Sequence, residues 1–156
     1  MLVLTSPAFA EGATIPAQYT EDGENVSPPL EWKGAPEATR SFALIVDDPD
    51  APDPKHPKTT WVHWVVVDLP PDAHVLAAGA SGSKMPRGAH EGRNDWKREG
   101  WGGPAPPIGR HRYIHKLYAL DTTLPNLKHP TKHELEQAMQ GHVLAEAKLI
   151  GTYARG

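Results

Sequence analysis

The sequence predicts a mainly β fold, on three observations. Segments 41–46 and 61–69 are short, strongly apolar runs bounded by turn residues, as buried strands usually are. Segment 112–120 alternates and is rich in aromatic residues, which indicates a third strand. Seventeen prolines and fourteen glycines in 156 residues favour many short elements joined by turns. This length fits one domain, so we expect a single domain over residues 1–156.

The first part of the chain predicts short strands separated by loops. Residues 1–10 are expected to form a first strand, because they lack the basic start and the apolar core of a signal peptide. Residues 11–29 are dense in Gly, Pro, Asn, Asp and Ser and indicate a loop, and residues 30–32 a brief strand. The apolar run SFALIV is expected to end at Asp47, where Asp and Pro residues cluster.

Strict alternation in segment 61–69 assigns its side chains to two faces, since strand side chains repeat every two residues. Trp64 is then expected in the core, on the face opposite His63. The full assignment places Trp61, His63, Val65 and Val67 on one face and Val62, Trp64, Val66 and Asp68 on the other.

The last part of the chain predicts a short helix. Thr131 followed by Glu134 has the capping-box pattern, and Gly141 is a natural stop after a helix that runs to about Gln140. Segment 142–153 is open between helix and strand on its residues alone, because Ala, Glu and Lys suit a helix whereas Gly, Thr and Tyr suit a strand.

Composition excludes several classes of function. A formal net charge of -3 provides no basic field for nucleic acid. The absence of cysteine excludes disulfides, zinc–thiolate sites and thiol catalysis. No apolar run approaches the ~20 residues of a membrane span, so we expect a soluble, cytoplasmic protein.

Segment 100–121 combines a rigid turn with a strand. Its first half alternates Gly and Pro, and its second half begins with Arg110, His111, Arg112 and Tyr113. A turn of fixed backbone that presents polar side chains is a common way to build a ligand pocket. We therefore predict half of a small-anion pocket here.

The other half is expected from two neighbouring strands. Asp48 follows the first apolar run, and His63 lies near the start of the second. If these strands are neighbours, Asp48, His63 and His111 converge at one sheet edge. A carboxylate partner would fix which nitrogen of an imidazole donates outward, and the Tyr113 hydroxyl would add a further donor.

Other polar residues are expected to have structural roles. Asp50 is predicted to cap its turn by accepting backbone N–H groups. Arg112 should point away from the pocket and pair with a carboxylate such as Asp121, and His115 is assigned to packing or to the surface.

Five motifs, read in order, cover nearly the whole chain. They are NVSPPLEW at 25–32, DPDAP at 48–52, WVHW at 61–64, GPAPP at 103–107 followed by HRY at 111–113, and GHVLA at 141–145. This ordered set resembles the phosphatidylethanolamine-binding protein (PEBP) family, and most closely its bacterial and archaeal branch, the Raf-kinase-inhibitor-like proteins.

The resemblance implies an antiparallel, two-sheet β-sandwich-like fold with a short helix near the C-terminus and segment 142–153 as a final strand. The helix that eukaryotic members carry after this strand is expected to be missing here. The resemblance also implies a small pocket at one end of the fold. The family's pocket positions correspond to Asp48, Pro52, Trp61, His63, Ala105, Pro106, Pro107, His111 and Tyr113.

The function that the resemblance implies is binding of phosphate, phosphorylated head groups or substitute anions such as acetate, without a cofactor, a metal or catalysis. Regulation of kinase signalling, through an unidentified protein partner, and a homodimeric state are further expectations from this family.

Two alternatives remain open from the residues. Asp48, His63 and His111 form a two-histidine, one-carboxylate set that is typical of some metal sites. Asp48 and His63 could also act together as the general base of a hydrolase. No serine, however, lies in the Gly-x-Ser-x-Gly pattern of a nucleophile elbow.

Overall fold

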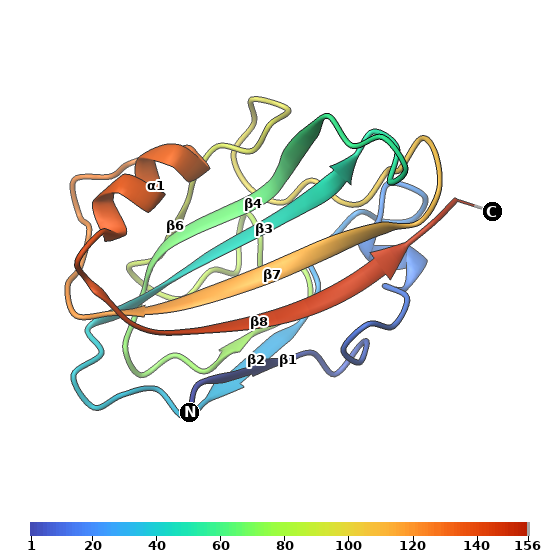
Figure 1. Ribbon diagram of the computed structural model, residues 1–156. Coiled ribbons are helices and arrows are strands. Elements are labelled where there is room, and N and C mark those ends of the chain that lie inside the picture. Colours follow the sequence, from blue (N-terminus) through green and yellow to red (C-terminus); the bar gives the residue numbers. More distant parts are fainter. Residues whose placement is uncertain (156) are drawn as a thin grey trace.

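The computed structural model describes residues 1–155, which form two antiparallel sheets and a short α-helix near the C-terminus, as predicted (Figure 1). The elements in chain order are β1 (Val3–Thr5), the 3-10 turn η1 (Ala17–Tyr19), β2 (Leu30–Lys33), β3 (Ser41–Ala51), β4 (Thr59–Leu69), β5 (Val75–Leu76), β6 (His90–Glu91), β7 (His111–Leu120), α1 (Lys132–Met139) and β8 (Val143–Tyr153). The strand orders are β6-β4-β3-β7-β8 and β1-β2-β5. Within residues 1–155, no helix is long and apolar enough to span a membrane.

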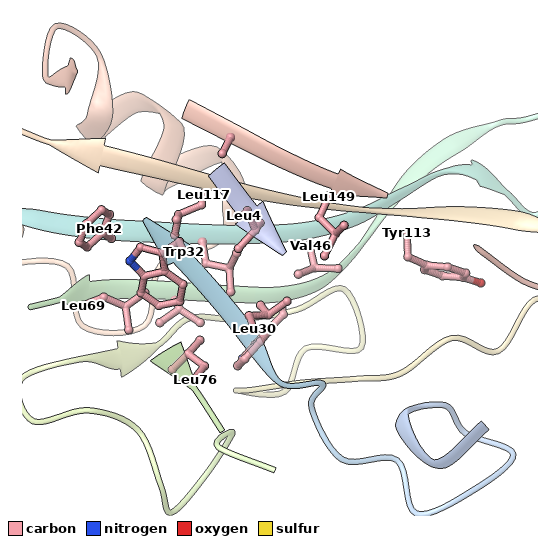
Figure 2. Close-up of a cluster of buried hydrophobic side chains, with 14 of the residues drawn as sticks. Leu4, Leu30, Trp32, Phe42, Val46, Leu69, Leu76, Tyr113, Leu117 and Leu149 are labelled. Carbon is pink, nitrogen blue, oxygen red and sulfur yellow. The ribbon is translucent and has the colours of Figure 1, made fainter. Parts of the chain in front are cut away.

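The central strand β3 is apolar on both faces because both faces are covered. Phe42, Leu44 and Val46 point into the apolar cluster between the two sheets, which Figure 2 shows. Ala43 and Ile45 pack on the other side, beneath α1. This two-sided burial explains why the segment has a continuous apolar run instead of alternation.

β3 does not end at Asp47, so the predicted boundary is wrong. The strand continues to Ala51, because Asp48 pairs with Trp61 and Ala51 pairs with Thr59 on β4. Asp has a low strand propensity, but pairing with β4 keeps these acidic residues in the strand. Tertiary structure here outweighs the local preference of the residues.

A β-bulge interrupts the pairing of β3 with β4. Val46 pairs with Trp64 and Asp47 pairs with Val62, so His63 is an extra residue without an opposite partner. A bulge places two successive side chains on nearly the same side of the sheet.

The predicted face assignment of β4 is therefore wrong in its first half. Val62 packs beneath α1 with Val65, although strict alternation would separate them. His63 and Trp64 lie on the same side, since their rings are 6.4 and 5.6 Å from the ring of Trp101. The prediction that Trp64 lies in the core is confirmed.

The C-terminal elements follow the prediction closely. Thr131 caps α1 through its side chain, Glu134 completes the capping box, and Gly141 has a left-handed φ of 82° just after the helix. The segment that the residues left open, 142–153, contains the strand β8, which pairs with β7 along its length.

Candidate functional site

A cavity of about 350 Å³ opens at one end of the larger sheet. At this end β3 and β8 finish and β4 and β7 begin, on the right of Figure 1. The structure brings all nine predicted pocket residues to its wall. They are Asp48, Pro52, Trp61, His63, Ala105, Pro106, Pro107, His111 and Tyr113.

Asp48 and His111 form a buried pair at the cavity wall. Nδ1 of His111 lies 2.6 Å from Oδ2 of Asp48, and Nε2 lies 2.8 Å from the carbonyl oxygen of Ile108. A carbonyl and a carboxylate both accept, so each ring nitrogen of His111 faces an acceptor. Burial raises the pKa of Asp48, whereas hydrogen bonds from His111 and from the N–H of Asp50 oppose that rise.

His63 is held in one orientation and one tautomer. Its Nδ1 donates to the carbonyl of Gly102 at 2.6 Å, and its ring meets the ring of Tyr113 edge-on at 5.1 Å. Burial lowers its pKa to about 4, so the ring is neutral at pH 7. Nδ1 carries the proton, and Nε2 is an acceptor without a partner among residues 1–155. Asp48 pairs with His111 instead of His63.

Tyr113 presents a buried hydroxyl to the cavity. The residue is 1% exposed, and within the described chain its oxygen has no hydrogen-bond partner. In Figure 2 the hydroxyl points away from the apolar cluster that the ring joins. Burial and the nearby Asp48 raise its pKa, so the hydroxyl stays protonated and can donate.

Trp96 forms a further part of the wall that the sequence analysis missed. Its ring packs edge-on against Trp61 at 5.5 Å and against His63 at 5.0 Å. Asn94 shapes this loop by accepting the backbone N–H of Trp96. A Cβ at Gly102 would lie 2.4 Å from the Trp96 ring, so only glycine permits this packing. The sequence signal that could have indicated this part of the wall is the turn-forming Asn94, which lies two residues before Trp96.

Arg155 and Glu21 also line the cavity and were not predicted. Nε of Arg155 donates to Asp22 at 3.0 Å, and the Tyr153 hydroxyl donates to the other oxygen of Asp22 at 2.8 Å. These contacts join positions 131 and 133 residues apart in sequence, and no local pattern could have indicated them.

Asp50 and Arg112 are paired with each other, which corrects two predictions. Asp50 does not cap its own turn. It accepts the backbone N–H of Arg112 at 2.9 Å and two guanidinium hydrogen bonds at 3.0 and 2.8 Å. This pairing lowers the pKa of Asp50. Asp121, the partner expected for Arg112, instead accepts from His142 at 2.8 Å.

The geometry does not support a metal site at the two histidines. Asp48 and His111 bond to each other, and the remaining nitrogen of His111 faces a carbonyl. Over residues 1–155, no group of three or more His, Asp or Glu side chains is arranged to hold a metal ion.

Comparison with known proteins gives consistent relatives along the whole chain. The family model described as phosphatidylethanolamine-binding protein matches residues 5–154. A UPF0098 protein of Methanothermobacter thermautotrophicus is 47% identical over 98% of this chain and 99% of its own length. A UPF0098 protein of Chlamydia pneumoniae is 41% identical over 97% of this chain and 98% of its own.

Solved structures agree with these relatives. The PEBP homolog CT736 of Chlamydia trachomatis superposes with a TM-score of 0.89 at 38% identity, over 99% of this chain and 98% of that one. E. coli YbcL, described as a new member of the mammalian PEBP family, gives 0.89 at 33% identity over 99% of both chains. The family match and this pairwise similarity extend across both sheets and the cavity, so the chain belongs to the phosphatidylethanolamine-binding protein family.

Proposed function

We propose that the protein binds a small anion, a phosphate-bearing or carboxylate group, in this cavity. The observation that supports this most directly is the buried Tyr113 hydroxyl, which faces the cavity without a partner in the described chain. A buried donor that is not satisfied costs ~1–3 kcal/mol, and a bound anion removes that cost.

Arg155 is the charge partner for an anion in the cavity. One of its guanidinium nitrogens is engaged by Asp22, which orients the group toward the cavity that it lines. The half-buried Trp61 and Trp96 and the neighbouring prolines limit the access of water. Electrostatic attraction is stronger where water is excluded.

Binding is favoured over hydrolysis by the residues of the wall. Among the described residues that line the cavity there is no Ser, Thr, Cys or Lys that could act as a nucleophile. The raised pKa of Tyr113 makes its oxygen a poor one. We therefore propose a binding protein without catalytic activity.

Calorimetric titration with inorganic phosphate tests this function. We expect Arg155→Gln to weaken binding by about tenfold, because a hydrogen bond to a charged group contributes ~1.5–3 kcal/mol. Arg110→Gln is the matched control, since Arg110 bonds to Thr14 and Thr152 and does not line the cavity. No binding by the wild type, or equal losses in both variants, would overturn the proposal.

A protein partner, a role in kinase signalling and a homodimeric state stay predictions from the family resemblance, and a cytoplasmic location stays a prediction from the lack of an apolar membrane span in the sequence. The anion site is separable from all four, because binding of inorganic phosphate can be measured on the purified chain alone.

A further inference from the structure

The carbonyl of Gly102 decides which hydrogen-bonding atom His63 presents to the cavity. It accepts from Nδ1 at 2.6 Å, so Nδ1 keeps the proton and Nε2 is left as an acceptor. If this carbonyl turned away, the proton could move to Nε2, and His63 would present a donor in place of an acceptor. The direction of the carbonyl therefore sets the polarity of this part of the wall.

The carbonyl belongs to the peptide group between Gly102 and Gly103, and Asn25 holds the opposite side of that peptide. The N–H of Gly103 donates to Oδ1 of Asn25 at 2.8 Å. A trans peptide is planar, and its N–H and C=O point in opposite directions. The hydrogen bond to Asn25 therefore also orients the carbonyl that faces His63.

The surroundings of this peptide leave little room for another arrangement. A Cβ on Gly103 would lie 2.3 Å from Oδ1 of Asn25, and a Cβ on Gly102 would lie 2.4 Å from the ring of Trp96. The N–H of Gly102 donates to the carbonyl of His63 at 3.0 Å. Only two successive glycines can therefore lie between Asn25 on one side and His63 and Trp96 on the other.

Asn25 adopts an unusual backbone conformation at this position. Its φ is 59°, in the left-handed region that few residues other than Gly, Asn and Asp adopt. A strained residue of this kind persists where the surrounding structure requires it. Asn25 begins the motif NVSPPLEW at 25–32, and none of the contacts described above gives that motif a role.

We infer that Asn25 is a positioning residue of the cavity: by orienting the peptide between Gly102 and Gly103, it holds His63 in the Nδ1–H tautomer with Nε2 as an acceptor toward the cavity. Asn25 does not line the cavity itself, so it acts only through this peptide. The inference concerns the protein without ligand and does not depend on the proposed function.

The tautomer of His63 tests the inference, and long-range ¹H–¹⁵N NMR of the ring measures it at about pH 7, where burial keeps the ring neutral. The His63→Gln variant identifies the signals. We expect the Nδ1–H tautomer in the wild type. Asn25→Gly suits the left-handed backbone but removes the acceptor, and it should shift the tautomer ratio by about fivefold toward Nε2–H. Asn25→Asp keeps an acceptor oxygen in place and should keep the wild-type tautomer.

Asp68→Gly is the matched control. Asp68 also has a left-handed φ, of 58°, and its carboxylate accepts the N–H of Leu124 at 2.8 Å, near the end of β4 that is remote from the cavity. The substitution therefore makes the same kind of change as Asn25→Gly. Both variants should lose stability to a similar degree, but only Asn25→Gly should change the tautomer of His63.

Several results would overturn the inference. They are an Nε2–H ring in the wild type, an unchanged tautomer ratio in Asn25→Gly, and an equal change in Asp68→Gly. If Asn25→Gly does not fold, hydrogen exchange on the wild type still decides, since the amide of Gly103 should exchange slowly and exchange as fast as that of an exposed amide would contradict its bond to Asn25. None of these measurements uses a ligand, so they are independent of the outcome of the phosphate titration.

Discussion

The hydroxyl groups of Tyr113 and Tyr153 differ in whether they have a hydrogen-bond partner, so their removal should have opposite effects on stability. The Tyr113 hydroxyl is buried without a partner in the described chain, whereas the Tyr153 hydroxyl donates to Asp22 at 2.8 Å. We expect Tyr113→Phe to raise the free energy of unfolding of the ligand-free protein by about 1 kcal/mol, because it removes an unpaired polar group. Tyr153→Phe should lower it by about 1 kcal/mol.

Urea unfolding without ligand measures both variants, and titration with phosphate completes the comparison. Tyr113→Phe should bind phosphate more weakly although it is more stable. A loss of stability in Tyr113→Phe as large as that in Tyr153→Phe would show that its hydroxyl has a structural partner.

At the residue scale, the sequence predicts side chains that adjoin turn motifs and misses those brought in from a distance. All nine predicted pocket residues line the cavity. Turns and strand ends indicated Asp48, His63, His111 and Tyr113, whereas the full set came from the family resemblance. Their part in binding stays a prediction. Arg155 reaches the same cavity from the end of the chain, and Asp50 pairs with Arg112 across two strands. Such pairings depend on strand neighbours, which local pattern does not specify.

At the scale of elements, α1 offers a test of stability that should leave the cavity unaffected. The Thr131 hydroxyl accepts the N–H of Glu134, and the Glu134 carboxylate accepts the N–H of Thr131. We expect Thr131→Ala to lower the free energy of unfolding by about 1 kcal/mol, as the loss of an N-cap usually does. Thr131→Ser keeps the hydroxyl and should be close to wild type. Urea unfolding measures the two variants.

Phosphate affinity should be the same in both threonine variants, because α1 packs on the outer face of the larger sheet, away from the cavity (Figure 1). If Thr131→Ser is as unstable as Thr131→Ala, the capping box is not what stabilises the start of the helix.

The predictions for β3 and β4 failed where pairing between the strands interrupts the alternation of side chains or extends a strand. The helix and its cap were predictable because every signal lies within ten residues. The bulge at His63 was not, because nothing in WVHW marks the extra residue, and the pairing of Val46 and Asp47 reveals it. The same pairing extends β3 through the acidic residues after Asp47 that the sequence assigned to a turn.

At the scale of the whole molecule, two buried neutral histidines couple stability to pH. Burial lowers the pKa of His63 and of His115 to about 4, against an ordinary value of 6.5. These two histidines therefore bind protons more strongly in the unfolded chain than in the folded one. Their contribution to the free energy of unfolding is fully present above pH 6.5 and is lost as the pH falls toward 4. The loss should approach ~1.4 kcal/mol per pH unit for each histidine.

Unfolding midpoints between pH 7 and about pH 5 measure this slope, and His115→Gln should reduce it by about half. Asp48, whose pKa is raised, acts in the opposite direction at the acidic end of this range. A stability that does not change with pH would contradict the assignment of both rings as neutral.

The overall fold was predictable in class but not in detail from residue patterns. Apolar runs and turn residues predict a β protein, and they give most strand centres correctly. The division into two sheets came from the family resemblance. The five and three strands and their order are known from the structure, because the order of strands depends on long-range pairing. The continuous apolar run of β3 is explained only by the layers that cover it on both faces.

The extra residue in β4 has a consequence for engineering. If His63 were deleted, Val62 and Trp64 would become consecutive, and their pairing with Asp47 and Val46 would run without a shift. The sheet would be more regular, but the cavity would lose the side chain that faces it from the bulge. Redesign guided only by strand ideality would therefore remove one side chain from the cavity wall.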